Sequence, residues 1–505
     1  MDNPAAVVKG AMTPGSVAEP PIAAVGVVYR RDQIRVGKVP MSTKIFQGIG
    51  ALPGSHKDFA FNTFLLLYYS QILGVPASSA SIVLAIALVV DAITDPIVGA
   101  YSDNFRSRLG RRHPFMYASA LPLGVFMYLL FSPPAGASEI SLLGWMLTFT
   151  LLVRLVFTFF VVPWNAVAAE YSQNYVERTS IITYRYLVGW VGGVTFAFVM
   201  YTFVFAGSPA YPAGQLDPAN YPLFALVLGC LIPLWCLVTT HLTRREVPYL
   251  LQPVSATPKF DFRELVSQVV MALGSPNFRL LFIAMLLFAG IAGVGGVFDI
   301  YMNTYFWEFK PQDLRWFGAT IIGALTAFIA VPLLQERFQK QNILVTVLAF
   351  SMALGMLKVI LRFADIWPDN GNPMLLVALI VHGCVVVFLL TTAGIMFGSM
   401  IADLVDEQAL RVQRRQEGVF SSVIGFSSKA TSSIGLIAGG FLLDFVVSFP
   451  RGTQPGEVGA DTLFRLAFTD GIAIHVFYAI PIYLTSRYTL TRERLKEIQA
   501  QLADA

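Results

Sequence analysis

The stretch VVDAITDPIVGAYSDNFRSRLGRRHPF, Val89–Phe115, predicts the architecture of the whole chain. It begins as an apolar helix whose two carboxylates, Asp91 and Asp95, are spaced four residues apart and so lie on one face. A strongly basic turn follows, and a second apolar helix starts at Pro114. In a bilayer each central charge costs about 2.5–3.5 kcal/mol on insertion scales, so these carboxylates must face a cavity or a partner. We therefore expect the other helices to enclose a polar cavity.

The composition is that of a polytopic membrane protein. Of the 505 residues, 55% are hydrophobic and 13% are charged, whereas soluble globular proteins have about 25% charged residues. The formal net charge of +4 is too small to indicate a partner, and nothing indicates nucleic acid. The three cysteines, Cys230, Cys236 and Cys384, lie in apolar runs without metal-ligand or disulfide spacing.

About twelve apolar runs are long enough to cross a bilayer. The expected spans are Asp58–Leu73, Ala80–Tyr101, Pro114–Phe131, Leu142–Ala168, Ile181–Phe205, Tyr221–His241, Phe278–Phe306, Trp316–Leu334, Ile343–Arg362, Met374–Met400, Gly418–Val447 and Leu463–Arg487. They predict an N-terminal six-helix bundle over 51–241, a cytoplasmic connection over 242–277 and a C-terminal six-helix bundle over 278–487. Residues 1–50, rich in Pro, Ala and Gly, are expected to be a disordered cytoplasmic tail, and 488–505 a second tail.

The basic residues orient these spans. Clusters of Lys and Arg follow spans 2, 6, 8 and 10, whereas the loops after spans 1, 3 and 5 contain none. The positive-inside rule therefore places both termini in the cytoplasm of a multi-pass protein in the cell (inner) membrane.

Two segments that lie six spans apart share one pattern. PWNAVAAEYSQNYVERTSIITYR (Pro163–Arg185) and GSMIADLVDEQALRVQRRQEGVFSS (Gly398–Ser422) both read as small residues, a carboxylate, a polar turn with arginine and a new apolar helix. Two parallel six-helix repeats explain this pattern, and they predict an all-α membrane fold with its site between the halves.

Several motifs resemble a known family. GAYSDNFRSRLGRR (Gly99–Arg112) is similar to the cytoplasmic turn motif of the major facilitator superfamily. KDFAFNTFLLLYY (Lys57–Tyr69), VVDAITDP (Val89–Pro96) and RSRLGRRHP (Arg106–Pro114) resemble its glycoside–pentoside–hexuronide:cation symporter branch, which includes melibiose permease. RLVFTFFVVPWNAVAAEYSQNYVERT (Arg154–Thr179) and IADLVDEQALRVQRRQEG…FSSK (Ile401–Lys429) fit the same branch, and the likeness extends from about Met41 to about Tyr488.

The resemblance implies roles for particular residues. Asp91 and Asp95 match the carboxylates that bind the coupling cation in this family, Thr158 shares that site, and Lys429 lies near it. Asp58 and Arg185 match residues that contact sugar. We also expect Thr94 to add a neutral oxygen to the cation site, in which Asp91 and Asp95 could hold Na⁺. The substrate site is expected to include Lys57, Arg154, Trp164, Asn165 and Asp299 as well.

This chain also departs from melibiose permease. Val161 stands where that protein has a sugar-binding aspartate, Asn165 where it has a tryptophan, and Leu88 where it has an arginine. The resemblance therefore implies a retained cation site and a rebuilt solute site.

Several of these residues have a second interpretation. Asp58 also suits the first turn of a helix, where the helix dipole stabilises a carboxylate. Arg154 also suits neutralisation of the paired carboxylates, and Lys429 also suits the balancing of a carboxylate. Arg185 also suits an interfacial position with its charge in water. Asp299 suits a solute contact and an extracellular gate equally.

A further set of charged residues fits a cytoplasmic gate rather than a solute site, since such pairs hold one conformation and break in another. The set comprises Asp103, Arg106, Arg108, Arg111, Arg112, Glu170, Arg178 and Asp403.

No nucleophile–base motif, phosphate loop or metal-ligand cluster is present in the sequence, which argues against an enzyme and against nucleotide-driven transport. We therefore expect alternating-access symport of a small polar solute, foremost a glycoside, coupled to Na⁺ or H⁺, by a protein that functions as a monomer in the lipid bilayer. One alternative is a Na⁺-dependent lysophospholipid symporter, which the loss of polarity at Leu88 and Val161 suits. A second is a non-transporting membrane sensor, against which the intact Asp91 and Asp95 argue.

Overall fold

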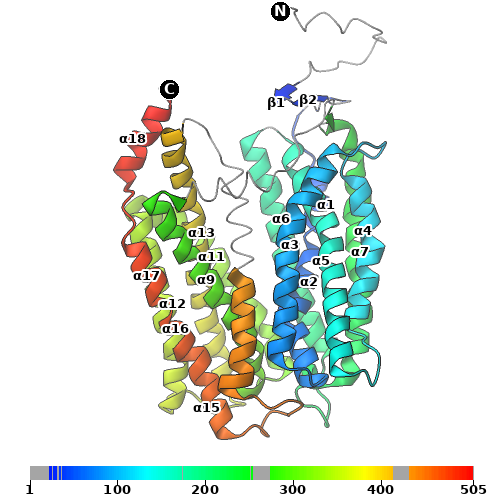
Figure 1. Ribbon diagram of the computed structural model, residues 1–505, viewed down its shortest axis with the longest axis vertical. Coiled ribbons are helices and arrows are strands. Elements are labelled where there is room, and N and C mark those ends of the chain that lie inside the picture. Colours follow the sequence, from blue (N-terminus) through cyan, green and yellow to red (C-terminus); the bar gives the residue numbers. More distant parts are fainter. Residues whose placement is uncertain are drawn as a thin grey trace, which may run out of the picture.

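The protein is described by a computed structural model over residues 22–24, 27–30, 33, 35, 37–172, 174–250, 252–253, 273–412 and 431–503. Its long helices form two groups that lie side by side, α1 to α7 in one and α9 to α18 in the other (Figure 1). Within the described residues, ten helices are long and apolar enough to cross a membrane, and Thr431–Val447 is a shorter apolar helix.

Within the described residues, the first group is built on five long helices, α3 to α7, and one broken helix. α4 packs against both α5 and α7, and α3 packs against α5. The elements are α1 (Met41–Ile49), α2 (Leu52–Phe59), η2 (Ala60–Leu65), η3 (Tyr68–Ile72), α3 (Ala77–Asn104), α4 (His113–Leu130), α5 (Glu139–Glu170), α6 (Tyr175–Val199), η4 (Met200–Val204), η5 (Gly214–Leu216), η6 (Pro218–Asn220), α7 (Tyr221–Thr243) and η7 (Arg244–Tyr249).

In the second group, α11 and α12 pack against α13, and α17 packs against α9. The elements are α9 (Pro276–Tyr301), η8 (Met302–Phe306), α10 (Pro311–Leu314), η9 (Arg315–Thr320), α11 (Ile321–Arg337), α12 (Lys340–Phe363), α13 (Pro373–Val412), η10 (Leu442–Val447) at the end of helix Thr431–Val447, α15 (Ala460–Phe468), η11 (Thr469–Ala473), α16 (Ile474–Val476), α17 (Ala479–Ser486) and α18 (Arg492–Ala503).

The first span is longer than the sequence indicates. α1 begins at Met41 and leads through Gly50 and Ala51 into α2 and η2, so the expected disordered tail over 1–50 is wrong for Met41–Ile49. α1 carries polar residues, such as Gln47, whose side chain makes a hydrogen bond within the fold. Because these residues lower its hydropathy, α1 is not recognised as part of a span from the sequence. The extension places Asp58 well inside a continuous helical span, not in its first turn.

Both chain ends contain further structure. β1 (Ile22–Ala24), β2 (Val27–Arg30) and β3 (Gln252–Pro253) form an antiparallel sheet in the order β1-β2-β3. This sheet and α18 lie at one end of the molecule, here called the terminal end (Figure 1). α18 falls within the expected tail 488–505, is helical, and packs against α13.

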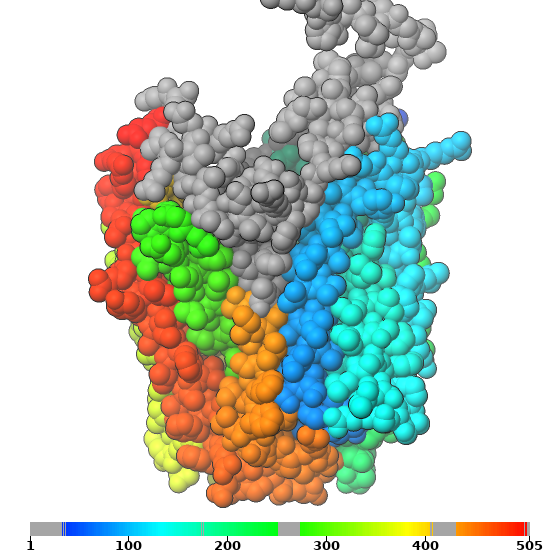
Figure 2. Space-filling view, in the orientation of Figure 1, coloured from blue at the N-terminus to red at the C-terminus, as the bar shows by residue number. Residues whose placement is uncertain are grey.

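The two groups join at the opposite end, here called the seam. A hydrophobic core runs across both groups there and includes Phe64 and Tyr69 from the first and Tyr301 and Val447 from the second. Figure 2 shows helix Thr431–Val447 lying along α3. π-helical turns end the spans that two repeats would place in equivalent positions, η3 with η8 and η4 with η10.

Candidate functional site

Two carboxylates and one hydroxyl meet between α3 and α5. The Thr158 Oγ1 atom lies 3.1 Å from Asp91 Oδ1 and 3.0 Å from Asp95 Oδ1. The same hydroxyl lies 3.1 Å from the backbone oxygen of Arg154. Since one hydroxyl has a single proton to donate, it satisfies only one of these three acceptors at a time. The cluster is therefore a convergent set of oxygen atoms suited to a monovalent cation or a proton.

Arg154 supplies positive charge to this cluster. Its Nη1 atom donates to Asp91 Oδ2 at 3.4 Å, and both side chains are largely buried. The guanidinium also lies over the Phe61 ring, 5.3 Å from its centroid. Arg154 therefore pairs with one of the two carboxylates of the cluster, Asp91.

Lys57 and Asp58 form a second ion pair on α2. Lys57 Nζ lies 2.6 Å from Asp58 Oδ1, and the ammonium also faces the Phe61 and Phe157 rings. Lys57 is buried, whereas the Asp58 side chain is 60% exposed. Asp58 thus keeps carboxylate surface for a ligand while Lys57 is held by its surroundings.

Of the other expected cation ligands, Thr94 donates its hydroxyl to the backbone oxygen of Asp91 on its own helix, at 3.2 Å. Lys429 lies outside the described residues. Within α3, Pro96 directly follows Asp95 and cannot donate a backbone hydrogen bond to Ala92.

A second polar group lies further along α5, toward the terminal end. The Arg185 guanidinium lies over the Trp164 ring, 4.1 Å from its centroid, and donates to the side-chain oxygen of Asn165. Trp164 is buried and exchanges hydrogen bonds with the backbone and side chain of Gln47 on α1. Gly50 permits this contact, because a Cβ atom there would lie 2.1 Å from the indole nitrogen.

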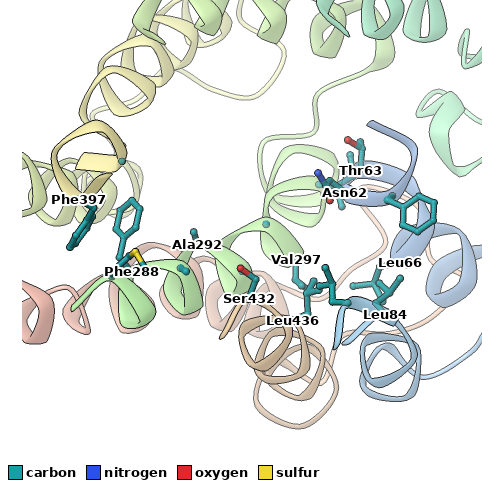
Figure 3. Close-up of a pocket in the computed structure, with 18 of the residues that line it drawn as sticks. Asn62, Thr63, Leu66, Leu84, Phe288, Ala292, Val297, Phe397, Ser432 and Leu436 are labelled. Carbon is teal, nitrogen blue, oxygen red and sulfur yellow. The ribbon is translucent and has the colours of Figure 1, made fainter. Parts of the chain in front are cut away.

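A cavity of about 690 Å³ lies between the two groups of helices. Arg154 lines it, so the residue that pairs with Asp91 also faces this space. Figure 3 shows Asn62 and Thr63 on one side of the cavity and Phe288 and Phe397 on the other. The cavity is therefore mixed, since Asn62, Thr63 and Arg154 from the first group and Ser432 from the second offer polar groups among mostly apolar side chains.

Asp299 lies on α9, seven residues after Ala292 and three after Gly296, which both line the cavity. This spacing places it on the same helical face, and its side chain is exposed. The structure thus keeps Asp299 beside the cavity but nearer to the seam than Arg154 and Thr158.

The expected gate residues separate into several groups. Glu170 Oε1 accepts from Arg111 at 2.6 Å and from Arg112 Nε at 2.9 Å. Arg112 also pairs with Asp103 at 2.8 Å. The remaining members lie elsewhere: Arg106 and Arg108 are exposed in the turn, Arg178 donates to the backbone oxygen of Ser172, and Asp403 pairs with Lys340 in the second group of helices.

Sequence reasoning missed several polar residues. Gln47 escaped notice because it lies before the first apolar run; its side-chain oxygen accepts from the Tyr171 hydroxyl at 3.1 Å. Burial raises the pKa of Tyr171, so this phenol stays a donor. The buried Lys358–Asp470 pair, 3.6 Å apart, joins α12 to η11. Lys358 and Asp470 are charged residues within apolar runs, and this is the signal by which the sequence could have identified them.

Asp444 is the other missed residue, and it joins the two groups of helices. Its carboxylate accepts from the Ser78 backbone N–H at 2.8 Å, the Ser78 hydroxyl at 2.6 Å and the Ala77 N–H at 3.3 Å. It therefore caps the start of α3 from the opposite group. Nearby, the Ser70 and Tyr301 hydroxyls lie 2.7 Å apart across the same seam.

Comparison with known proteins agrees with this architecture. The model of the MFS/sugar transport protein family matches residues 46–492. The chain is 25% identical over 471 residues to the putative glycoside/cation symporter YagG of Escherichia coli, covering 92% of this chain and 95% of that protein. It is 25% identical over 503 residues to the sodium-dependent lysophosphatidylcholine symporter 1 of Gallus gallus, covering 92% and 90%. A solved structure of the nucleoside transporter NupG has a TM-score of 0.61 at 13% identity, covering 89% of this chain and 99% of that one.

Proposed function

Because the chain belongs to the MFS/sugar transport protein family, we propose that it is a secondary symporter that moves a small polar solute with a cation. The solute class we favour is a glycoside, as in the name of the relative YagG. The coupling ion is Na⁺ or H⁺, and transport proceeds by alternating access of the two groups of helices.

The contact set at Thr158 carries this proposal. Two membrane-embedded carboxylates share one hydroxyl at 3.0–3.1 Å, and Arg154 pairs with one of them. Such groups are costly in a membrane and mark ion pathways. A structural ion pair would need only one of the two carboxylates.

Arg154 links the ion to the solute in this mechanism. It pairs with Asp91 on one side and lines the cavity on the other. A cation bound between Asp91 and Asp95 competes with Arg154 for negative charge and frees its donors for the solute. Asp58, Lys57, Trp164, Asn165, Arg185 and Asp299 are proposed to complete the solute pathway around Arg154.

The seam gives the direction of access. The core and hydrogen bonds that join the two groups at the seam close that end of the cavity. With the basic turns in the cytoplasm, the structure corresponds to a state closed to the outside. We propose the cell (inner) membrane as its location, with both termini cytoplasmic. In this frame the Arg111–Glu170–Arg112–Asp103 cluster belongs to the cytoplasmic gate.

A lysophospholipid-type amphiphile is the second candidate solute. The apolar side chains Phe288, Phe397 and Leu88 line the cavity, and lysophosphatidylcholine symporters are among the relatives. The cation mechanism is the same for either solute.

Uphill transport in proteoliposomes tests the coupling role. Asp95→Asn is expected to abolish cation-driven accumulation, because the proposed cation site then loses one of its two carboxylates, while solute exchange at equal concentrations continues. Ser119→Ala on α4 is the control, since it also removes a buried hydroxyl, which donates to the Met116 backbone oxygen away from the cluster. Accumulation by the Asp95→Asn protein that equals the unmodified protein's would refute the assignment.

A further inference from the structure

Three spans of the second group place ionisable side chains around one turn of α12. Lys358 comes from α12 itself, Asp470 from η11, His475 from α16 and His382 from α13. Ionisable residues are costly within a membrane and mark ion pathways. We propose that this cluster is a proton site of the second group, in which His475 takes up the proton and thereby loosens the seam. The inference rests on the alternating access proposed above.

Lys358 and Asp470 form the charged centre of the cluster. Lys358 Nζ lies 3.6 Å from Asp470 Oδ2, with 22% of the lysine side chain and 10% of the aspartate side chain exposed. An ammonium at this distance from the carboxylate repels a metal cation, so the ion that the cluster can exchange is a proton. Trp367 Nε1 donates to the Lys358 backbone oxygen at 2.8 Å. Trp367 therefore reports on the environment of this turn.

The two histidines are held in defined tautomers by backbone oxygens. His475 Nδ1 lies 2.8 Å from the Asp470 backbone oxygen, and His382 Nε2 lies 3.0 Å from the Leu354 backbone oxygen. Because a carbonyl oxygen only accepts, each of these two nitrogens carries a hydrogen and donates it. In the neutral rings, the nitrogen that can take up a proton is therefore Nε2 in His475 and Nδ1 in His382.

His475 is the better proton acceptor of the two. Its ring packs on the α12 backbone, where a Cβ atom built on Gly355 would lie 2.0 Å from His475 Nε2. The charges of Asp470 and Lys358 both act on His475, whereas those that act on His382 within the described residues are Lys358 and His475. A neighbouring carboxylate favours a protonated imidazole, and a neighbouring cation disfavours it. Asp470 therefore selects His475.

Asp299 on α9 is a second carboxylate of this region, since the charges of Lys358 and Asp470 act on it. It lies beside the cavity, which gives protons a route to the cluster. Further titratable groups on the packed elements are Tyr478, which stacks on the His475 ring, Arg362, which donates to the Pro368 backbone oxygen, and the exposed Asp461 and Arg465 of α15. Asp470 is thus the carboxylate that Lys358 and a protonated His475 would share.

Protonation weakens the link between α12 and η11. A proton on His475 adds a second positive charge beside the carboxylate that holds Lys358. η11 continues α15, which packs against η8 and η10 at the seam. Weaker anchoring of η11 therefore loosens α15 and, with it, the closure at the seam. The proton acts from the second group, whereas the ion at Asp91 and Asp95 acts from the first.

The proton site is tested by titrating purified protein in nanodiscs from about pH 5 to about pH 9, which brackets the ordinary imidazole pKa of about 6.5. The probe is the proton alone, and the readout is the part of the tryptophan emission that Trp367→Phe removes. We expect one transition in this range. His475→Asn is expected to abolish it, because the amide keeps a donor for the Asp470 backbone oxygen but takes up no proton.

His382→Gln is the matched control, since it keeps a donor for the Leu354 backbone oxygen and should retain the transition. His475→Gln provides a second replacement without a titratable group, in case His475→Asn folds poorly. Absence of a transition in the unmodified protein, or its persistence in the His475 variants, would overturn the proton site. Equal loss in the His382 and His475 variants would overturn the assignment of the proton to His475.

The link to the seam is tested with Ser70→Cys in a background without the native cysteines. Its rate of reaction with a membrane-impermeant maleimide is measured with His475 intact and with His475→Asn. The ratio of the two rates removes the pH dependence of the thiol itself. We expect this ratio to rise as the pH falls through the transition. A ratio that stays constant would overturn the action of the proton on the seam.

Neither measurement uses a solute, so the two proposals fail separately. If the transition is absent while accumulation in proteoliposomes still depends on Asp95, the second proton site is overturned and the symport proposal stands. If Asp95→Asn retains full accumulation, the symport proposal is overturned, whatever the titration of His475 shows.

Discussion

Replacing Thr158 by valine removes the hydroxyl that joins the two carboxylates while keeping the shape of the side chain. The structure gives this hydroxyl two carboxylate neighbours, at 3.1 Å and 3.0 Å, in a buried position. A hydrogen bond to a charged group contributes about 1.5–3 kcal/mol. Because one proton serves one acceptor at a time, we assign one such bond to the site rather than two.

The sign of the effect separates the two coupling ions. If the ion is Na⁺, the hydroxyl oxygen is one of its ligands, and its loss should raise the Na⁺ concentration for half-maximal transport about tenfold or more. If the ion is H⁺, loss of a donor to the carboxylates makes their protonation easier. The pH at which transport is half-maximal should then rise by about one unit or more.

The assay is solute uptake into proteoliposomes, with the Na⁺ concentration and the pH varied independently. Thr158→Ser is the matched control, since it keeps the hydroxyl and should retain both dependences. A folded Thr158→Val protein with unchanged Na⁺ and pH dependences would show that the Asp91–Thr158–Asp95 cluster is not the coupling site.

Two further predictions concern the closures at the two ends. Asp444→Asn weakens the cap on α3 by about 2 kcal/mol, since it loses a charged acceptor of three donors. A cysteine at Ser70, in a background without the native cysteines, should therefore react faster with a membrane-impermeant maleimide. Asp217→Asn, which makes the same charge-removing change at a cap within one group, should not change the rate. An unchanged rate in Asp444→Asn would argue against a seam role. Glu170→Gln leaves the buried Arg111 and Arg112 without their shared carboxylate and should lower stability by about 3–5 kcal/mol. Asp103→Asn, at a side chain that is 38% exposed, should cost about 1 kcal/mol or less, and equal losses in the two variants, measured by thermal unfolding, would contradict the assignment of Glu170 as the centre of the cluster.

The sequence predicted the parts of this protein that depend on local spacing. Asp91 and Asp95 share a face of α3 as the four-residue spacing requires, and Thr158 meets both. The expected spans other than Gly418–Val447 overlap described helices over most of their length, although α3, for example, runs over Ala77–Asn104 rather than Ala80–Tyr101; of the expected span Gly418–Val447, residues 418–430 lie outside the described residues. Hydropathy registers only the apolar part of a helix, so capped and polar ends go undetected.

Contacts between distant segments were beyond sequence reasoning. Gln47 bonds to the backbone of Trp164, and Gly50 is required by the same indole, but α1 carries no apolar run that marks it as part of a span. Asp444 looks like an isolated charge near the end of an apolar helix until the two groups are brought together. Asp403 pairs with Lys340 in the second group and Glu170 pairs with Arg111 in the first, so the two carboxylates belong to separate clusters, which the sequence did not show.

α3 connects the contacts at the seam to those at the terminal end. Its first turn is held by Asp444 from the other group, and its last turn carries Asp103, which pairs with Arg112. Between them Pro96 interrupts the backbone hydrogen-bond ladder directly after Asp95, so the interruption lies at the Asp91–Thr158–Asp95 cluster. Under the proposed function, an ion bound between Asp91 and Asp95 would act directly beside Pro96, on the helix that reaches both closures.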